Sequence, residues 1–191
     1  MAEAVKILGI AGSLRRESYN RALLRAAGKL LPLGAALETF DLQGIPVFCQ
    51  DDELSPPAAV TELKRSVRWA DALLFATPEH NFSIPAALKN AIDWVSRPTA
   101  DNAWAGKPAA LMGASWGRFG TARAQLHLRQ IFVYLDILPI NKPAVMIGDA
   151  ANAFGPDGSL VDEKAKDMVR QLLEGLVAWT LRLRGSGKPP A

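Results

Sequence analysis

Hydroxyl, guanidinium and amide side chains gather in one short turn near the N-terminus. They follow an apolar run at residues 5–10 and surround the expected start of a helix: Ser13, Arg15, Ser18 and Asn20. A helix start offers unpaired backbone N–H groups and a partial positive charge, which suit a phosphate. Hydroxyls and a guanidinium favour a terminal phosphate over a pyrophosphate. The turn therefore predicts an anion site, with the alternative that Ser18 is only a helix cap and Arg15 only a solvated charge.

Other phosphate-binding and catalytic patterns do not occur in the sequence. No G-x-G-x-x-G follows the first apolar run, and there is no G-x-x-x-x-G-K-[ST] segment. Cys49 is the only cysteine, and His80 and His127 are the only histidines. These residues are poor material for a metal site or a thiolate cluster. We therefore expect no metal and no intrachain disulfide.

Length and composition suit one globular domain. The chain has 191 residues, of which 49% are hydrophobic and 21% charged. We expect residues 1–184 to form that domain and residues 185–191 to be a disordered tail. The net charge of +3 is too small to indicate nucleic acid. No stretch is long enough for a membrane span, and residues 5–10 are too short for a secretory signal, so we expect a cytoplasmic protein.

Apolar spacing predicts that strands and helices alternate five times. Strands are expected at about 5–10, 36–40, 72–76, 108–114 and 140–147, and helices at about 20–31, 60–70, 84–95, 120–136 and from residue 163. Ser83 and Asp162 are expected helix caps. Pro143 indicates that the fifth strand is irregular or lies at an edge.

This alternation favours a doubly wound α/β fold with a parallel sheet. Ligands of such sheets bind beyond the carboxyl ends of the strands. The polar segments 11–20, 77–83 and 114–120 follow the first, third and fourth strands. We therefore expect the three segments to converge on a single site.

Three segments carry a resemblance to a known family. They are GSLRRESYN at 12–20, PEHNFSIPAALKNAIDWVSRP at 78–98 and GASWGRFGTARAQLHLRQIF at 113–132. They resemble the NADPH-dependent FMN reductase family, and above all its bacterial chromate and quinone reductase branch. The resemblance implies a flavodoxin-like fold, with a five-stranded parallel sheet in the order 2-1-3-4-5 between two helix layers, and FMN bound without a covalent link.

The resemblance also assigns residues to the parts of the flavin. Four positions match the family's phosphate-binding residues: Ser13, Arg15, Ser18 and Asn20. Six match the loops beside the isoalloxazine ring: Pro78, Glu79, His80, Asn81, Ser115 and Gly117. For Glu79 the alternative is an ordinary turn residue.

Several aromatic positions are open at this point. His80 and Leu126 stand where many relatives have tyrosine, which leaves open the ring contact of the first and any tetramer contact of the second. Trp116 suits either the wall of a flavin pocket or a partner subunit. Three more aromatic residues suit an exposed apolar rim at a dimer interface: Phe82, Trp94 and Trp104.

The implied activity is a two-step oxidoreductase reaction. NADPH or NADH reduces FMN, and a small acceptor then takes the electrons: a quinone, chromate, an azo or nitro compound, or free flavin. The flavin carries this chemistry, so no catalytic side chain is expected. A homodimer, with the neighbouring subunit covering part of the flavin, or a homotetramer is implied.

Two other classes of function compete with the reductase. A flavodoxin-like electron carrier would bind FMN without oxidising NAD(P)H, but the mildly basic charge counts against it. A regulatory protein of the same fold would have lost the flavin, but the complete set of residues in the first turn counts against it.

Overall fold

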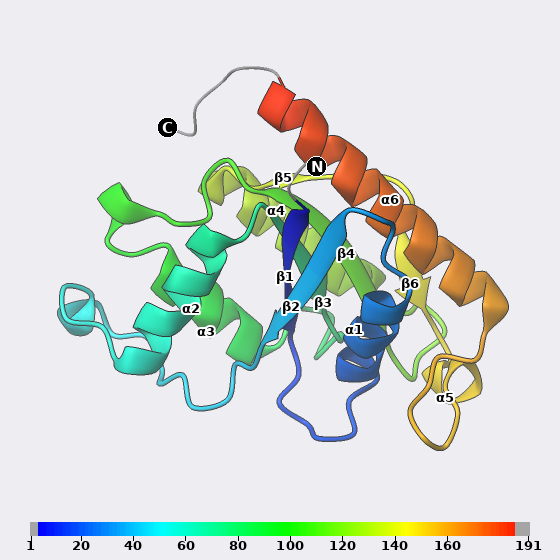
Figure 1. Ribbon diagram of the computed structural model, residues 1–191. Coiled ribbons are helices and arrows are strands. Elements are labelled where there is room, and N and C mark those ends of the chain that lie inside the picture. Colours follow the sequence, from blue (N-terminus) through cyan, green and yellow to red (C-terminus); the bar gives the residue numbers. More distant parts are fainter. Residues whose placement is uncertain (1–3, 186–191) are drawn as a thin grey trace.

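A six-stranded parallel sheet forms the centre of the structure, a computed structural model that describes residues 4–185 (Figure 1). The strand order is β2-β1-β3-β4-β5, with β6 also paired to β4, so the predicted order of the five strands is confirmed. The strands are β1 (Val5–Ala11), β2 (Ala35–Phe40), β3 (Ala72–Ala76), β4 (Pro108–Ala114), β5 (Leu138–Pro139) and β6 (Val145–Ile147).

Helices cover both faces of the sheet, which confirms the three layers (Figure 1). One face carries α1 and α6, and the other carries α2, α3 and α4. The helices are α1 (Tyr19–Lys29), α2 (Ala58–Trp69), α3 (Ala86–Val95), α4 (Ala122–Leu135), α5 (Ala150–Ala153) and α6 (Glu163–Gly185), with 3-10 turns η1 (Gln50–Asp52) and η2 (Thr99–Asp101). Within residues 4–185 no helix is both long enough and apolar enough to cross a membrane.

Alternate residues of the central strands enter two separate cores. In β3, Leu74 faces the core under α1 and α6, whereas Leu73 and Phe75 face the core under α2, α3 and α4. All of β3 is buried, which explains why its sequence is apolar without interruption. The ring of Phe75 packs against Phe132 and Trp104, with centroids 5.1 and 6.0 Å apart.

The predicted fifth strand is two short strands in the structure. β5 pairs with the start of β4 and β6 pairs with its end. Pro143 lies between them and has no N–H to donate to a ladder. The prediction of an irregular edge is therefore confirmed, and the prediction of a single strand is wrong.

The ends of two helices test the predicted caps. Asp162 caps α6, because its Oδ1 accepts a hydrogen bond of 2.8 Å from the N–H of Ala165. Ser83 does not cap α3, which is preceded by Pro85 and has no side-chain cap. The predicted tail begins one residue too early, since Gly185 ends α6. Residues 1–3 and 186–191 lie outside the described residues.

The expected exposed rim of aromatic residues is wrong for both of its tryptophans. Trp94 and Trp104 are buried, and only Phe82 is exposed, at 65%. Each indole N–H donates to a main-chain carbonyl, that of Trp94 to Pro46 (2.8 Å) and that of Trp104 to Ile92 (3.0 Å). A satisfied N–H lets an indole enter a core, and neighbouring sequence does not reveal such a distant acceptor.

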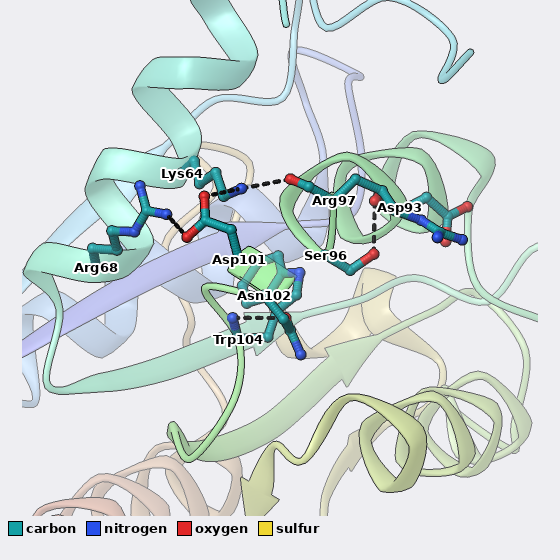
Figure 2. Close-up of polar contacts among 8 residues, drawn as sticks. All are labelled: Lys64, Arg68, Asp93, Ser96, Arg97, Asp101, Asn102 and Trp104. Carbon is teal, nitrogen blue, oxygen red and sulfur yellow. Dashed lines mark hydrogen bonds and ion pairs between the residues drawn. The ribbon is translucent and has the colours of Figure 1, made fainter. Parts of the chain in front are cut away.

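A charged cluster fixes the chain that leaves α3 (Figure 2). Asp101 lies between Lys64 and Arg68 of α2, and the Lys64 ammonium also donates to the carbonyl of Arg97. Lys64 is buried, so these oxygens compensate its charge. The hydrogen bond from Arg68, followed by that from Lys64, holds the pKa of Asp101 below its usual 3.8.

We predict that Asp101→Asn lowers the free energy of unfolding at pH 7 by about 1 kcal/mol, a modest loss because the carboxylate is largely exposed. A lowered pKa contributes stability above pH 3.8, and this contribution is lost as the pH falls through the pKa of the folded state. Urea unfolding at pH 7 and pH 3 should therefore show a difference from wild type that shrinks in acid. Asp51→Asn, at an exposed carboxylate, is the control. An equal difference at both pH values would contradict the assignment.

Candidate functional site

Three loops meet at the carboxyl ends of β1, β3 and β4. They surround a cavity of about 820 Å³, a volume typical of small-molecule sites. The predicted convergence of segments 11–20, 77–83 and 114–120 is confirmed. All ten residues predicted for the site line this cavity: Ser13, Arg15, Ser18, Asn20, Pro78, Glu79, His80, Asn81, Ser115 and Gly117.

The first loop presents the start of α1 to the cavity. Ser18 is the N-cap, and its Oγ accepts hydrogen bonds from the N–H groups of Asn20 (3.2 Å) and Arg21 (3.4 Å). Its hydroxyl donates to no acceptor within residues 4–185, so a ligand could receive its proton. The first turn of α1 holds no acidic residue, so no side chain there offsets the positive end of the helix dipole. Arg15 is exposed at the same rim and Ser13 is half-buried.

Asn20 joins α1 to β4. Its Nδ2 donates to the carbonyl of Ala114 (2.9 Å), and its Oδ1 accepts from the N–H of the same residue (2.9 Å). The side chain is buried. Both ends of the amide are therefore engaged by main chain, and Asn20 positions the first loop against the third.

Glu79 joins the second loop to the third. Its side chain is only 6% exposed, and its Oε2 accepts from the N–H groups of Arg123 (3.0 Å) and Ala124 (3.2 Å) at the start of α4. The residue before α4, Thr121, makes no side-chain cap. Glu79 thus serves as the cap of a helix that begins more than 40 residues later in the chain. Neither of the two interpretations open for Glu79 at the level of sequence anticipates this role.

The second loop contains a tight turn with unusual backbone angles. His80 and Ser83 exchange two main-chain hydrogen bonds of 2.9 Å, and both residues between them have positive φ, 49° for Asn81 and 65° for Phe82. Positive φ at both central positions defines a type I′ turn. Asparagine tolerates this conformation, whereas for a bulky residue such as phenylalanine it raises the conformational free energy by roughly 1–2 kcal/mol. His80 is exposed, and the hydroxyl of Ser83 contacts His127 Nδ1 at 3.0 Å.

Arg123 is a residue of the site that sequence reasoning missed. It lines the cavity and makes an ion pair with Glu79. Its guanidinium carbon lies 3.6 Å from the ring centroid of Phe82 and 5.5 Å from that of Phe119. Arg123 is part of the third family-like segment, but neither its type nor its spacing indicates these contacts.

Gly113 at the end of β4 and Gly117 in the third loop lie in different surroundings. A Cβ on Gly113 would lie 2.2 Å from Thr121 Oγ1 and 2.4 Å from the carbonyl oxygen of Thr77, so protein packing excludes a side chain. A Cβ on Gly117 would meet only Ser115 Oγ, at 4.0 Å. Packing within the described chain therefore does not require glycine at 117, a position that faces the cavity.

Trp116 and Tyr19 form an aromatic wall between the first and third loops. Their ring centroids are 5.5 Å apart in an edge arrangement, and Tyr19 also packs on Phe154 at 5.1 Å. Trp116 lines the cavity and is 64% exposed in the single chain, so contact with a partner subunit stays open as well.

Comparison with known proteins assigns this chain to a family. The model of the NADPH-dependent FMN reductase family matches residues 5–152. The chain belongs to this family. Members of it work with FMN and NAD(P)H, and the chain is accordingly an NAD(P)H-dependent oxidoreductase of flavodoxin-like fold.

Individual relatives agree over nearly the whole chain. The NAD(P)H-dependent FMN reductase PA1204 of Pseudomonas aeruginosa is 53% identical over 97% of this chain and all of its own length. An NADPH:quinone oxidoreductase of Arabidopsis thaliana is 43% identical, over 95% of this chain and 94% of its own. The solved structure of FerB, a flavoenzyme NAD(P)H:(acceptor) oxidoreductase of Paracoccus denitrificans, superposes with a TM-score of 0.86 at 33% identity, covering 94% of this chain and 98% of its own.

The cavity fits the FMN of this reductase family. Its lining offers a helix N-terminus, two hydroxyls and the exposed Arg15 guanidinium, which has no ion-pair partner within residues 4–185, and these groups suit a single phosphate. The lining also offers loop backbone and aromatic side chains, which suit a planar ring. At Gly117 the chain leaves room that packing within the protein does not explain.

We predict that Asn20→Ala lowers the free energy of unfolding by about 2–3 kcal/mol, because two buried main-chain groups of Ala114 lose their partner. Chemical denaturation measures this loss. Asn152→Ala, at an exposed position, should change stability by about 0.5 kcal/mol or less. Equal effects of the two substitutions would show that the Asn20 amide does not join the loops.

Proposed function

We propose that this protein is an FMN-containing NAD(P)H:quinone reductase whose flavin occupies the 820 Å³ cavity. One observation carries the proposal: the start of α1, with no acid in its first turn, opens into a cavity that is also lined by loop backbone and by the rings of Tyr19, Phe82 and Trp116. A phosphate and a planar ring of one ligand would complement these two kinds of surface.

The phosphate would be held by the first loop. Arg15 and the hydroxyls of Ser13 and Ser18 would donate to its oxygens, together with backbone N–H groups at the start of α1. Ser18 keeps its role as helix cap, because its Oγ accepts from the helix while its proton is available to a ligand. Asn20 contributes by fixing the loop rather than by donating its amide.

The ring would lie between the second and third loops. Main-chain groups of residues 78–81 and 115–117 would contact its polar edge, with Pro78, His80, Asn81, Ser115 and Gly117 lining this part. Glu79 would hold the second loop in place, because its carboxylate accepts hydrogen bonds from the main chain at the start of α4. Bound FMN supplies hydride transfer between NAD(P)H and an acceptor, so the side chains bind, orient and exclude water.

Quinones are the acceptor class that we favour. The Arabidopsis relative is named an NADPH:quinone oxidoreductase. The exposed rings of Phe82 and Trp116, which line the cavity, would suit a flat apolar acceptor. Chromate, azo or nitro compounds and free flavin are further acceptors predicted from the sequence, and NADPH and NADH are both predicted donors.

A homodimer is the assembly that we propose. Three large apolar side chains on α4 are exposed in the single chain, as are the rings at the cavity rim. A second copy covering this surface would bury it and shield the flavin from water. The side chains on α4 are Leu126, Val133 and Tyr134. Leu126 would thus make an apolar contact; a tetramer and a cytoplasmic location are further predictions from the sequence.

We predict that Arg15→Ala weakens FMN binding about 10-fold or more, because a charge-assisted hydrogen bond to a phosphate is lost. Arg16→Ala removes the same charge from the neighbouring exposed position and should change the dissociation constant less than about 3-fold. Titration of the apoprotein with FMN, followed by flavin fluorescence, measures both. Equal losses would refute the phosphate assignment.

We predict that the purified protein is yellow and oxidises NADPH or NADH when a quinone is supplied. The visible spectrum and the absorbance of the nicotinamide at saturating donor test this. A flavodoxin-like carrier would be yellow but would not consume NAD(P)H, and a regulatory protein would take up no FMN at all. Either result would overturn the proposal.

A further inference from the structure

Two contacts reach the type I′ turn at residues 80–83 from outside it: His127 Nδ1 lies 3.0 Å from the Ser83 hydroxyl, and Arg123 stacks on the Phe82 ring. Phe82 occupies a left-handed conformation, φ 65°, that disfavours a bulky side chain, and its ring is largely exposed. Two-residue turns of this type favour an asparagine–glycine pair. Here the pair is Asn81–Phe82, so the local sequence by itself favours the turn poorly.

The contact with Phe82, the residue in the disfavoured conformation, comes from Arg123. Its guanidinium stacks on the Phe82 ring at 3.6 Å, close to the separation of atoms in van der Waals contact. Phe119 flanks the same guanidinium at 5.5 Å. The charge is therefore shared between a ring of the second loop and a ring of the third.

Arg123 is itself held in place by Glu79. Its backbone N–H and its guanidinium both bind the carboxylate of Glu79, which also receives the N–H of Ala124. That carboxylate is buried. The guanidinium Nε is buried without an acceptor among the described residues, so Glu79 and the two rings are what fix the group.

We propose that Arg123 is a positioning residue for the flavin reaction: acting through Phe82, it keeps the turn at 80–83 in the left-handed conformation that shapes the ring end of the cavity. This inference rests on the proposed function, which places the flavin ring against residues 78–81. It assigns to Arg123 no contact with flavin or substrate.

A double-substitution cycle tests the proposal. Phe82→Gly turns the pair into asparagine–glycine, which adopts the type I′ turn without support. Arg123 should then be dispensable. We expect Arg123→Ala alone to weaken FMN binding about 10-fold, and Arg123→Ala in the Phe82→Gly background to change it less than about 3-fold.

Hydrogen exchange of the His80 and Ser83 amides gives a second readout that needs no flavin. Both amides are hydrogen-bonded within the turn. In the apoprotein, Arg123→Ala should speed their exchange about 10-fold, and the double variant should exchange like Phe82→Gly alone. If wild type binds no FMN, the proposed function fails, whereas this exchange still tests the role of Arg123 in the turn.

Two further variants keep the result interpretable. Arg118→Ala removes an exposed cation of the third loop and should leave exchange and FMN binding unchanged. Arg123→Lys keeps the charge near Glu79 without the planar group, and should fall between wild type and Arg123→Ala. An equal loss of FMN binding on removing Arg123 in both backgrounds would overturn the proposal in favour of direct ligand contact. Unchanged exchange in Arg123→Ala and Arg123→Lys would overturn it as well.

Discussion

The reciprocal pair of hydrogen bonds between the Asn20 amide and the main chain of Ala114 is the interaction on which the site depends. Parallel strands deliver their loops to one edge of the sheet, but that alone does not set the spacing of the loops. Asn20 sets it on one side by joining α1 to the end of β4. Glu79 sets it on the other side by joining the second loop to α4. Three loops distant in sequence thus form one rigid rim.

The rim also separates two kinds of surface within one cavity. At the α1 end, the positive end of the helix dipole and the Arg15 guanidinium give a positive potential, and the first turn holds no acid to offset it. At the opposite end, the main acid is Glu79, which is buried and committed to α4. The small net charge of the chain hides this local arrangement. Local geometry, and not overall charge, accounts for the attraction of an anionic ligand.

Much of the fold could be predicted from the sequence, because short-range patterns determine it. The unbroken apolar run of β3 indicates a strand buried on both faces, and Asp162 caps α6 through a residue three positions away. The predictions are wrong where a hydrogen-bond partner distant in the sequence determines the position of a side chain. Trp94 is buried because its N–H reaches the carbonyl of Pro46, and Ser83 is drawn away from α3 by its pairing with His80. Neither partner follows from helical or strand spacing.

In the candidate site, too, some features could be predicted from the sequence and others could not. Its ten residues are those that the family resemblance of three motifs implies, and their meeting at one edge could be predicted because each motif directly follows a buried strand. Which of them bind main chain, and which are left to contact a ligand, could not be predicted. Asn20 and Glu79 carry polar groups that a ligand could use, yet main chain more than 40 residues away engages both. Arg123 has no local signal at all, since its contacts cross from α4 to a turn in another loop.

The interruption at Pro143 has a consequence for how copies of the chain meet. An edge strand presents unpaired main-chain groups that can recruit a strand of another molecule. Here that edge is split into segments of two and three residues, too short to form a continuous ladder with a neighbour. Growth of the sheet across molecules is thereby blocked on this side. A second copy meeting this side of the molecule would have to use side-chain contacts in place of backbone pairing.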